Sequence, residues 1–476
     1  MNQKVIYDFL IEAVSPLYFG DGQSGQESPL FQSDKGRSVI PGNALGGALR
    51  EYLKQTGVPD KIILKYMGGV ELGEEGEETF VTSGIYISDG KMTKTTGYSR
   101  KEGTAVNPAY GAAEKHSKYT LEHLPEETKI FFRIEGDVRD DTQENDELCA
   151  AELEKIIGTW AKGFETQRLV LGGQKSNGFG RCRLEKLEKT VFPLDSGECL
   201  NQYIFRSRDR KGKALDWKEL LYYESEDRCR VVFSMEGVFP YGVYQSFDVK
   251  NADNTGGAAA KDSKGRQQLT GLLKKMGRYF IPSTSVKGLV KNEIRLLLRR
   301  IKDKALADKK LEELFGGEAA PGKVVFSDLQ IEGGREVQVE RYVKNEQKKW
   351  QEEQRGPIYV KIDRLTGGAY ASALKHQQEI QGRAKIRFEL SADQYGGDIT
   401  PYIFPLIYVL RRIGTGTVPL GGRTVIGLGG FSAQKVEVAV GKDGLRTIET
   451  GGNLSEENRK QLEQWFESFK RWCDGE

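Results

Sequence analysis

One stretch of the sequence occurs twice, and this repetition constrains the fold more than any other feature. Residues 39–53 read VIPGNALGGALREYL, and residues 280–298 read FIPSTSVKGLVKNEIRLLL. In both copies a strand-like end reaches Ile-Pro, and apolar residues at helical spacing follow a short polar segment. Because proline disfavours helical backbone in the residue before it, no helix begins earlier. The pattern predicts one helix at about 43–56 and another at about 286–301.

A glycine-rich loop follows each copy of this stretch. Residues 172–180 read GGQKSNGFG and residues 421–429 read GGRTVIGLG, so the glycines fall at the same positions. Between helix and loop, Ser-Asp pairs recur in the same order at 88–89 and 327–328. Preserved order indicates an internal duplication, and two copies with so long a period indicate tandem domains rather than a solenoid.

Composition excludes several classes of protein. The chain has 476 residues, 38% of them hydrophobic and 29% charged, and a net charge of +2. A net charge this small does not attract nucleic acid over the whole surface, so any phosphate binding depends on local clusters of basic residues. The five cysteines form no CxxC pair, which favours free thiols in the cytoplasm and no zinc. No apolar run approaches the ~20 residues of a membrane span, and the start lacks the apolar centre of a signal peptide.

Periodicity and composition divide the chain into segments. Strands are expected at 4–14, 80–90, 129–135, 179–187, 230–239 and 385–390, and a third helix near 147–162. We therefore predict an α+β fold with a first domain at 1–190, a connection at 191–228, a second domain at 229–440 and a C-terminal helix at 441–476.

Three long polar segments interrupt these domains. The arms 91–128 and 333–380 show no clear period, and loops this long inside a compact domain are usually functional or mobile. The composition of 240–278 favours disorder. The C-terminal helix carries an apolar stripe, which fits packing on its own domain and docking of a neighbour equally well; its members are Leu462, Trp465, Phe466, Phe469 and Trp472.

The helix starts and the glycine loops are candidate phosphate sites. A helix N-terminus presents free N–H groups and positive partial charge. The polar residues at these two starts are Asn43, Ser283, Thr284 and Ser285. By their place at the helix starts, Asn43 in the first copy and Ser283 and Thr284 in the second are expected to cap the first free N–H groups. The glycines permit close backbone approach to a ligand, with Lys175 or Arg423 alongside. A structural turn is the alternative for each loop, and neither loop has the residues of a nucleotide-binding P-loop.

The order of these elements resembles the RAMP superfamily, the repeat-associated proteins of CRISPR effector complexes. It is most similar to the backbone subunits of type III systems, and two copies in one chain resemble the tandem subunits of the type III-D branch. The likeness covers about residues 1–190 and 229–440. It implies a ferredoxin-like (RRM-like) palm and a thumb-like arm in each domain. It also implies binding to a guide RNA and its paired target RNA, beside other CRISPR effector subunits, in antiviral defence.

The resemblance implies a role for one lysine. Helices of this family usually carry a lysine before the second glycine, and that lysine contacts a guide phosphate. Lys287 occupies this position in the second copy, whereas Gly46 replaces it in the first. The resemblance therefore implies a weaker contact in the first domain.

The resemblance also bears on cleavage. Members that cut target RNA carry an Asp two residues before a Pro, and Glu27 takes that place here. The second loop has no such landmark, so Asp248 is the preferred candidate there, followed by Asp253 and Asp262. Three functions stay open: a non-cutting RNA scaffold, an endoribonuclease that uses Mg²⁺, and a metal-free guide-processing nuclease. The last class tends to use an early histidine, and the first histidine here is His116.

Overall fold

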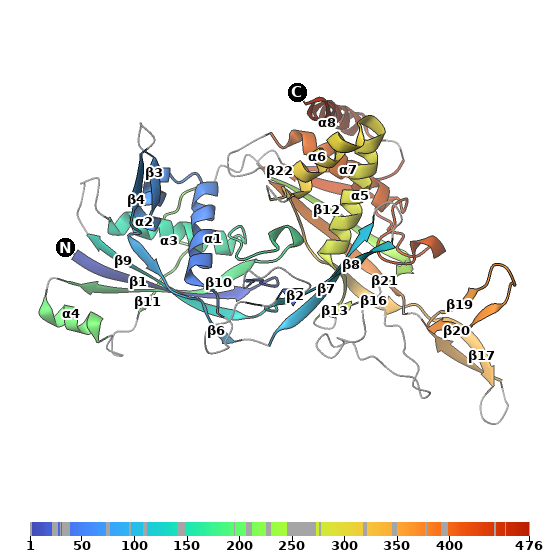
Figure 1. Cartoon of the computed structure of the whole chain (residues 1–476), viewed down its shortest axis with the longest axis horizontal. Helices are drawn as coiled ribbons and strands as arrows, with labels where there is room; N and C mark the ends of the chain where they lie inside the picture. Colours follow the sequence, from blue (N-terminus) through green and yellow to red (C-terminus); the bar gives the residue numbers. More distant parts are fainter. Residues whose placement is uncertain are drawn as a thin grey trace. The chain divides into compact units, whose positions relative to one another are not determined.

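The chain forms two compact units, Met1–Glu226 and Asp227–Glu476 (Figure 1). The structure is a computed structural model, and it describes residues 2–20, 27–28, 30, 39–72, 77–94, 97–107, 112–139, 148–194, 196–205, 212–224, 230–244, 273–275, 278–317, 321–344, 350–376, 378–391, 398–441, 444–452 and 454–475. Among these residues, no helix combines the length and the apolar character needed to cross a bilayer.

The first unit is built on one antiparallel sheet. Its strands are β1 (Asn2–Ala13), β5 (Ile85–Ile87), β6 (Lys91–Lys94), β9 (Lys129–Arg139), β10 (Cys182–Pro193) and β11 (Lys213–Ala214). They lie in the order β11-β10-β1-β9-β5, and β6 also pairs with β9. The helices are α1 (Gly42–Gln55), α2 (Asp60–Met67) and α3 (Ala150–Glu165), and α1 and α3 lie on one face of the sheet (Figure 1).

The amphipathic pattern of α1 explains its position. Leu49 and Leu53 are fully buried, and the indole N–H of Trp160 in α3 donates to the Leu49 carbonyl over 3.1 Å. Beneath the helices, the rings of Phe9 and Phe132 stack with their centroids 4.9 Å apart on neighbouring strands. Core packing therefore fixes α1 over the sheet.

The second unit has a larger sheet of the same kind. Its strands are β12 (Arg230–Val243), β13 (Leu273–Lys275), β14 (Arg278–Ile281), β15 (Val324–Phe326), β16 (Leu329–Glu336), β21 (Ile380–Ser391), β22 (Lys435–Val440) and β23 (Leu445–Glu449). Their order is β13-β14-β16-β21-β12-β22-β23, and β15 also pairs with β21. The helices are α5 (Ser283–Ile301), α6 (Lys304–Phe315), α7 (Thr400–Gly414) and α8 (Glu456–Asp474).

The two units share one topology. The shared elements follow in the same chain order, β1-α1-β5-β9-α3-β10 in the first unit and β12-α5-β16-β21-α7-β22 in the second. In space the strands lie as β10-β1-β9-β5 in the first unit and as β22-β12-β21-β16 in the second. Both units therefore mix helices with antiparallel strands, so the α+β class and the tandem duplication are confirmed.

The two arms contain antiparallel hairpins. In the first arm β7 (Ser99–Asn107) pairs with β8 (Ala112–His123), and the short β2 (Glu27–Ser28) runs parallel to β8. In the second arm β17 (Val339–Lys344) pairs with β18 (Trp350–Arg355), and β19 (Ile358–Ile362) with β20 (Ala369–His376). Figure 1 shows β17, β19 and β20 projecting from the sheet of the second unit.

Some segments differ from the sequence-based expectations. The segment 191–228, expected as a connection, contains α4 (Gly197–Ile204), which packs on β10. In the same segment, Trp217, Leu220 and Tyr223 pack on the core of the first unit from turns and irregular backbone. The strand expected at 80–90 is divided between β4 (Glu78–Val81), which pairs with β3 (Gly69–Leu72), and β5.

The C-terminal helix packs on its own unit. Leu462, Trp465 and Phe469 of α8 belong to the core of the second unit. The Trp472 indole N–H also donates to Glu313 of α6 over 2.8 Å. Of the two alternatives for the apolar stripe, the structure therefore favours the intramolecular one.

Candidate nucleic-acid interface

Both key helices begin in the same way. The N–H of Gly42 donates to Asp89 Oδ1 over 2.7 Å, and that of Ser283 donates to Asp328 Oδ1 over 2.8 Å. Each aspartate belongs to one of the repeated Ser-Asp pairs. The expectation that Asn43 caps the first helix was wrong, because Pro41 occupies the cap position and a distant aspartate accepts the bond.

This arrangement changes the predicted anion site. The caps expected in the second unit, Ser283 and Thr284, are replaced by Asp328 in the same way, and the Ser283 side chain is 0% exposed. A carboxylate at the helix N-terminus accepts a hydrogen bond from one of the free N–H groups. Its negative charge also neutralises part of the positive charge that would attract a phosphate there. Asn43 is exposed, and Thr284 and Ser285 are half-buried, so these remain accessible. A phosphate is therefore better placed beside the first turn than at its tip.

The glycine loops are held against the backbone that follows the first strand of each unit. Gly173 N–H donates to the Tyr18 carbonyl over 2.8 Å, and Gly422 N–H donates to the Tyr244 carbonyl over 2.6 Å. A Cβ atom at Gly421, whose φ is +85°, would lie 2.6 Å from the Tyr244 carbonyl oxygen. The glycines thus have a structural role, and the turn that they form presents the neighbouring basic residues.

The basic side chains of these loops occupy adjacent positions, not equivalent ones. Lys175 begins the 3-10 turn Lys175–Asn177, whereas Arg423 precedes the matching turn Thr424–Ile426 and has a φ of +56°. The Arg423 guanidinium carbon lies 5.5 Å from the ring centroids of both Tyr244 and Tyr359. Since Tyr359 lies in β19, Arg423 connects the glycine loop to the second arm.

Tyr359 is itself held by a buried carboxylate. Its hydroxyl donates to Glu379, which is 3% exposed, over 2.5 Å. Burial and this carboxylate raise the pKa of Tyr359 to about 12, although the charge of Arg423 acts in the opposite sense. The phenol therefore stays protonated at neutral pH and keeps its donor role.

Lys287 begins a row of cations on α5. Lys287, Lys291, Arg295 and Arg299 follow one another at intervals of four residues, so they lie along one side of the helix. Burial, and then the charge of Lys291, lowers the pKa of Lys287 to about 8. At the far end, Arg299 pairs with Asp308 over 3.3 Å. This row concentrates positive charge in a chain whose net charge is small.

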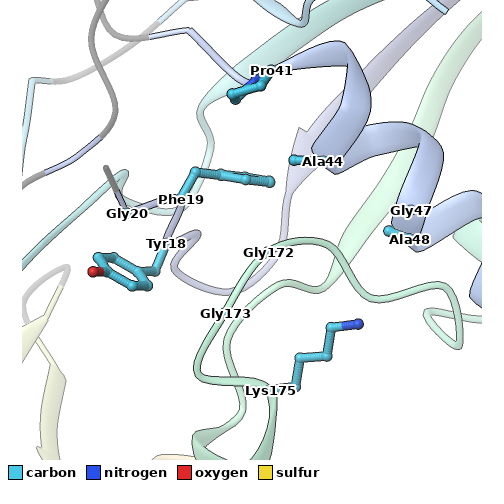
Figure 2. Close-up of a pocket in the computed structure, with 10 residues that line it drawn as sticks. All are labelled: Tyr18, Phe19, Gly20, Pro41, Ala44, Gly47, Ala48, Gly172, Gly173 and Lys175. Carbon is cyan, nitrogen blue, oxygen red and sulfur yellow. The ribbon is translucent and has the colours of Figure 1, made fainter. Parts of the chain in front are cut away.

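In the first unit, the helix and the glycine loop enclose a hollow of about 360 Å³ (Figure 2). Its lining consists of Tyr18, Phe19, Gly20, Pro41, Ala44, Gly47, Ala48, Gly172, Gly173 and Lys175. The structure thus brings together, in one lining, two elements that the sequence marks as separate candidate phosphate sites: the repeated helix and the glycine loop. Although Lys175 is exposed as a whole, neighbouring atoms partly desolvate its amine and lower its pKa.

The sequence did not reveal the role of two tyrosines, one in each unit. Tyr18 and Tyr244 hold the two glycine loops through their carbonyl oxygens. The available signal was their recurrence shortly after the first strand of each unit, but a contact through the backbone leaves no mark in side-chain chemistry.

The candidate carboxylates are only partly placed. Glu27 lies in β2, opposite Thr120 of β8. Asp248, Asp253 and Asp262 fall outside the described residues. Within the part of the chain that the structure describes, no group of three or more His, Cys, Asp or Glu residues is arranged to hold a metal ion. His123 is 8% exposed and packs edge-on against Phe179, so its environment is that of a core residue.

Comparison with known proteins gives the family. No curated protein shows significant similarity to the chain. The model of the RAMP superfamily matches residues 10–183 and 255–473. The two matches cover most of the chain and include both helix starts and both glycine loops, and from them we conclude that the chain belongs to the RAMP superfamily.

Proposed function

We propose that the chain is a guide-RNA-binding backbone subunit of a type III CRISPR effector complex, of the tandem kind that the type III-D branch contains. Superfamily membership indicates a CRISPR-associated RNA-binding module that works with RNA and other subunits. The observation that carries the proposal is the duplicated construction: in each unit an Asp-capped helix follows Ile-Pro, and a glycine loop is held by a tyrosine carbonyl that follows the first strand. One RNA strand that passes both units would meet the same elements twice.

In this proposal each unit is a ferredoxin-like (RRM-like) palm. The support is the order of four strands, β10-β1-β9-β5 and β22-β12-β21-β16, with a helix after the first strand and another after the third. This order places the repeated helix and the last strand, which follows the glycine loop, in one layered unit. The palm thus supplies a rigid base for binding.

The basic side chains near the helix starts would hold the phosphates of the guide. Lys287 and Arg423 serve the second unit, and Lys175 serves the first. Because Asp328 opposes anions at the tip of α5, the phosphate path lies beside the helix, along the row from Lys287 to Arg295. Such contacts position RNA and read no sequence.

The arms would act as thumbs that separate RNA segments. The β19–β20 hairpin carries Leu365 at its turn, 97% exposed, with Ile362 and Tyr370 also exposed. Exposed apolar and aromatic side chains at the end of a projecting hairpin suit contact with base faces, which every sequence offers. In the first unit the β7–β8 hairpin takes the corresponding role.

The proposal is tested with the full chain and a fluorescent single-stranded RNA of guide length. Anisotropy gives the dissociation constant over a series of salt concentrations. We expect binding to weaken with salt, and the double variant Lys287→Ala/Arg423→Ala to lose at least tenfold in affinity and to show a shallower salt dependence.

The control is Lys460→Ala, which removes an exposed cation of α8 that pairs with Glu456. It should retain the affinity of the unmodified chain. If the double variant binds as tightly as this control, the proposed phosphate contacts are wrong. If the unmodified chain binds no RNA, the proposed function itself is wrong.

A further inference from the structure

The hollow in the first unit results from small side chains on α1. Three of its lining residues, Ala44, Gly47 and Ala48, have no side-chain atom beyond Cβ. The loop side of the hollow is formed by Gly172 and Gly173. In Figure 2 the ring of Phe19 points toward Ala44, and Lys175 extends from the glycine loop below. The backbone segments therefore enclose an open space rather than a packed contact.

The second unit differs at the corresponding positions. Matching Pro41 with Pro282 places Gly46 at the position of Lys287 and Ala48 at that of Leu289. Leu289 packs against the core of its unit. The first unit therefore lacks both the lysine and the larger apolar side chain, and the smaller Ala48 lines the hollow there.

The lining defines the chemistry of that ligand. Aromatic rings come from Tyr18 and Phe19, and Pro41 and the alanines add apolar surface. Among the described residues of the lining, Lys175 carries the ionised side chain. A phosphate alone would bury its charge against apolar atoms, which is unfavourable. A flat aromatic group with an adjacent anion would match both the apolar surface and the charge of Lys175. The volume of the hollow, about 360 Å³, lies at the small end of the range for ligand sites.

We propose that the first unit accepts one unstacked nucleobase of the guide RNA in this hollow, with Lys175 on an adjacent phosphate. The inference rests on the proposed function and assigns the two units different roles. The first holds a base together with its phosphate, whereas the second holds phosphate through Lys287. Stacking on aromatic and apolar surfaces tolerates all four bases, so the site adds affinity without a sequence code.

The test is a cycle that combines protein variants with RNA lacking single bases. The RNA is first shortened to the minimum that retains full affinity for the full chain, so that one register dominates. One abasic nucleotide is then placed at each position in turn. We expect one position at which the abasic substitution weakens binding about tenfold, as the loss of one stacked base does.

The protein variants fill the hollow or keep it open. Ala48→Leu introduces the side chain that the second unit has at this position. It should weaken binding of the intact RNA by the same factor and make binding indifferent to the abasic position. The matched control is Ala214→Leu, which adds the same side chain at an exposed position of β11, outside the hollow, and should behave like the unmodified chain.

A second measurement applies if Ala48→Leu fails to fold. A photoreactive 4-thiouridine at the sensitive position of the RNA should crosslink to residues 17–20 or 44–48 of the unmodified chain. Crosslinks elsewhere, or independent and additive losses in the cycle, overturn the inference. Full RNA affinity with no sensitive position overturns the base site alone, whereas absence of RNA binding overturns the proposed function as well.

Discussion

The backbone N–H of Ser283 donates to Asp328 Oδ1 over 2.8 Å at the start of α5. The acceptor lies 45 residues further along the chain, so the bond joins the helix to the segment between β15 and β16. The same bond, between Gly42 and Asp89, joins α1 to the segment between β5 and β6. One interaction therefore fixes the helix start and sets the charge beside it.

Asp328→Asn separates these two effects. The amide oxygen can still accept the bond, but the negative charge is lost. We expect a loss of stability of about 1 kcal/mol or less, since asparagine is also a good cap. We expect RNA affinity to rise, because the charge that opposes phosphate at the helix start is removed. Urea unfolding and RNA anisotropy measure the two effects.

Two variants serve as controls for this prediction. Asp328→Ala removes the hydrogen bond as well as the charge. It should lower the free energy of unfolding by about 1–2 kcal/mol, a larger loss than that of the asparagine variant. Glu456→Gln removes a charge from the first turn of α8 and should leave RNA affinity unchanged. Equal RNA affinity in Asp328→Asn and the unmodified chain would show that no phosphate approaches the start of α5.

Local signals in the sequence predicted the repeated elements. The apolar spacing after Ile-Pro predicted helices at 43–56 and 286–301, and the structure has them at Gly42–Gln55 and Ser283–Ile301. The coincidence of glycines predicted the two matching loops, whose turns share left-handed backbone at Gly178 and Gly427. These features were accessible because they depend on residues close together in the chain.

Features that depend on distant residues were not accessible. The sequence shows that Asp89 and Asp328 recur, but it does not show which N–H group either one accepts. The sequences of β17 and β18, VERYVK and WQEEQR, are mostly polar, so these strands lack the alternation by which a half-buried strand is recognised. Trp217 packs on a core formed by residues far earlier in the chain. Only the fold brings these groups together.

Two glycines of the second loop should respond differently to alanine. Both have positive φ, +85° at Gly421 and +92° at Gly427, but only Gly421 has a carbonyl oxygen, that of Tyr244, within 2.6 Å of the added Cβ. Gly427→Ala should therefore cost about 1–2 kcal/mol from backbone strain alone. Gly421→Ala should cost more, because the loop must also move away from β12. Urea unfolding of the two variants compares them directly, and equal losses would contradict the close approach.

Trp472 is expected to anchor α8 to the second unit. It is 8% exposed, its ring packs edge-on against Tyr402 at 5.1 Å, and its N–H donates to Glu313. Trp472→Ala should destabilise the second unit by about 3–5 kcal/mol, the usual loss for a buried tryptophan. The matched control is Phe466→Ala, since Phe466 lies on the same helix but is 41% exposed. This substitution should lower the free energy of unfolding much less.

Calorimetry can resolve this change if the two units unfold separately. The transition of the second unit should shift to lower temperature in Trp472→Ala, and that of the first unit should stay in place. A variant with unchanged transitions would mean that α8 contributes little to its unit.

The pKa of Lys287 predicts how RNA binding depends on pH. Burial and Lys291 lower this pKa from 10.5 to about 8, so the folded chain binds fewer protons than the unfolded chain between these values. For this group, stability therefore rises as pH increases from about 8 to 10.5. RNA affinity should change in the opposite direction, because the amine that attracts phosphate loses its charge above about pH 8.

Anisotropy at pH 7 and pH 9.5, at constant ionic strength, should show several-fold weaker binding at the higher value. Lys287→Arg keeps the positive charge over this range and should remove most of the difference, since arginine does not titrate there. If Lys287→Arg and the unmodified chain lose affinity equally, another group is responsible for the pH dependence and Lys287 does not contact the phosphate.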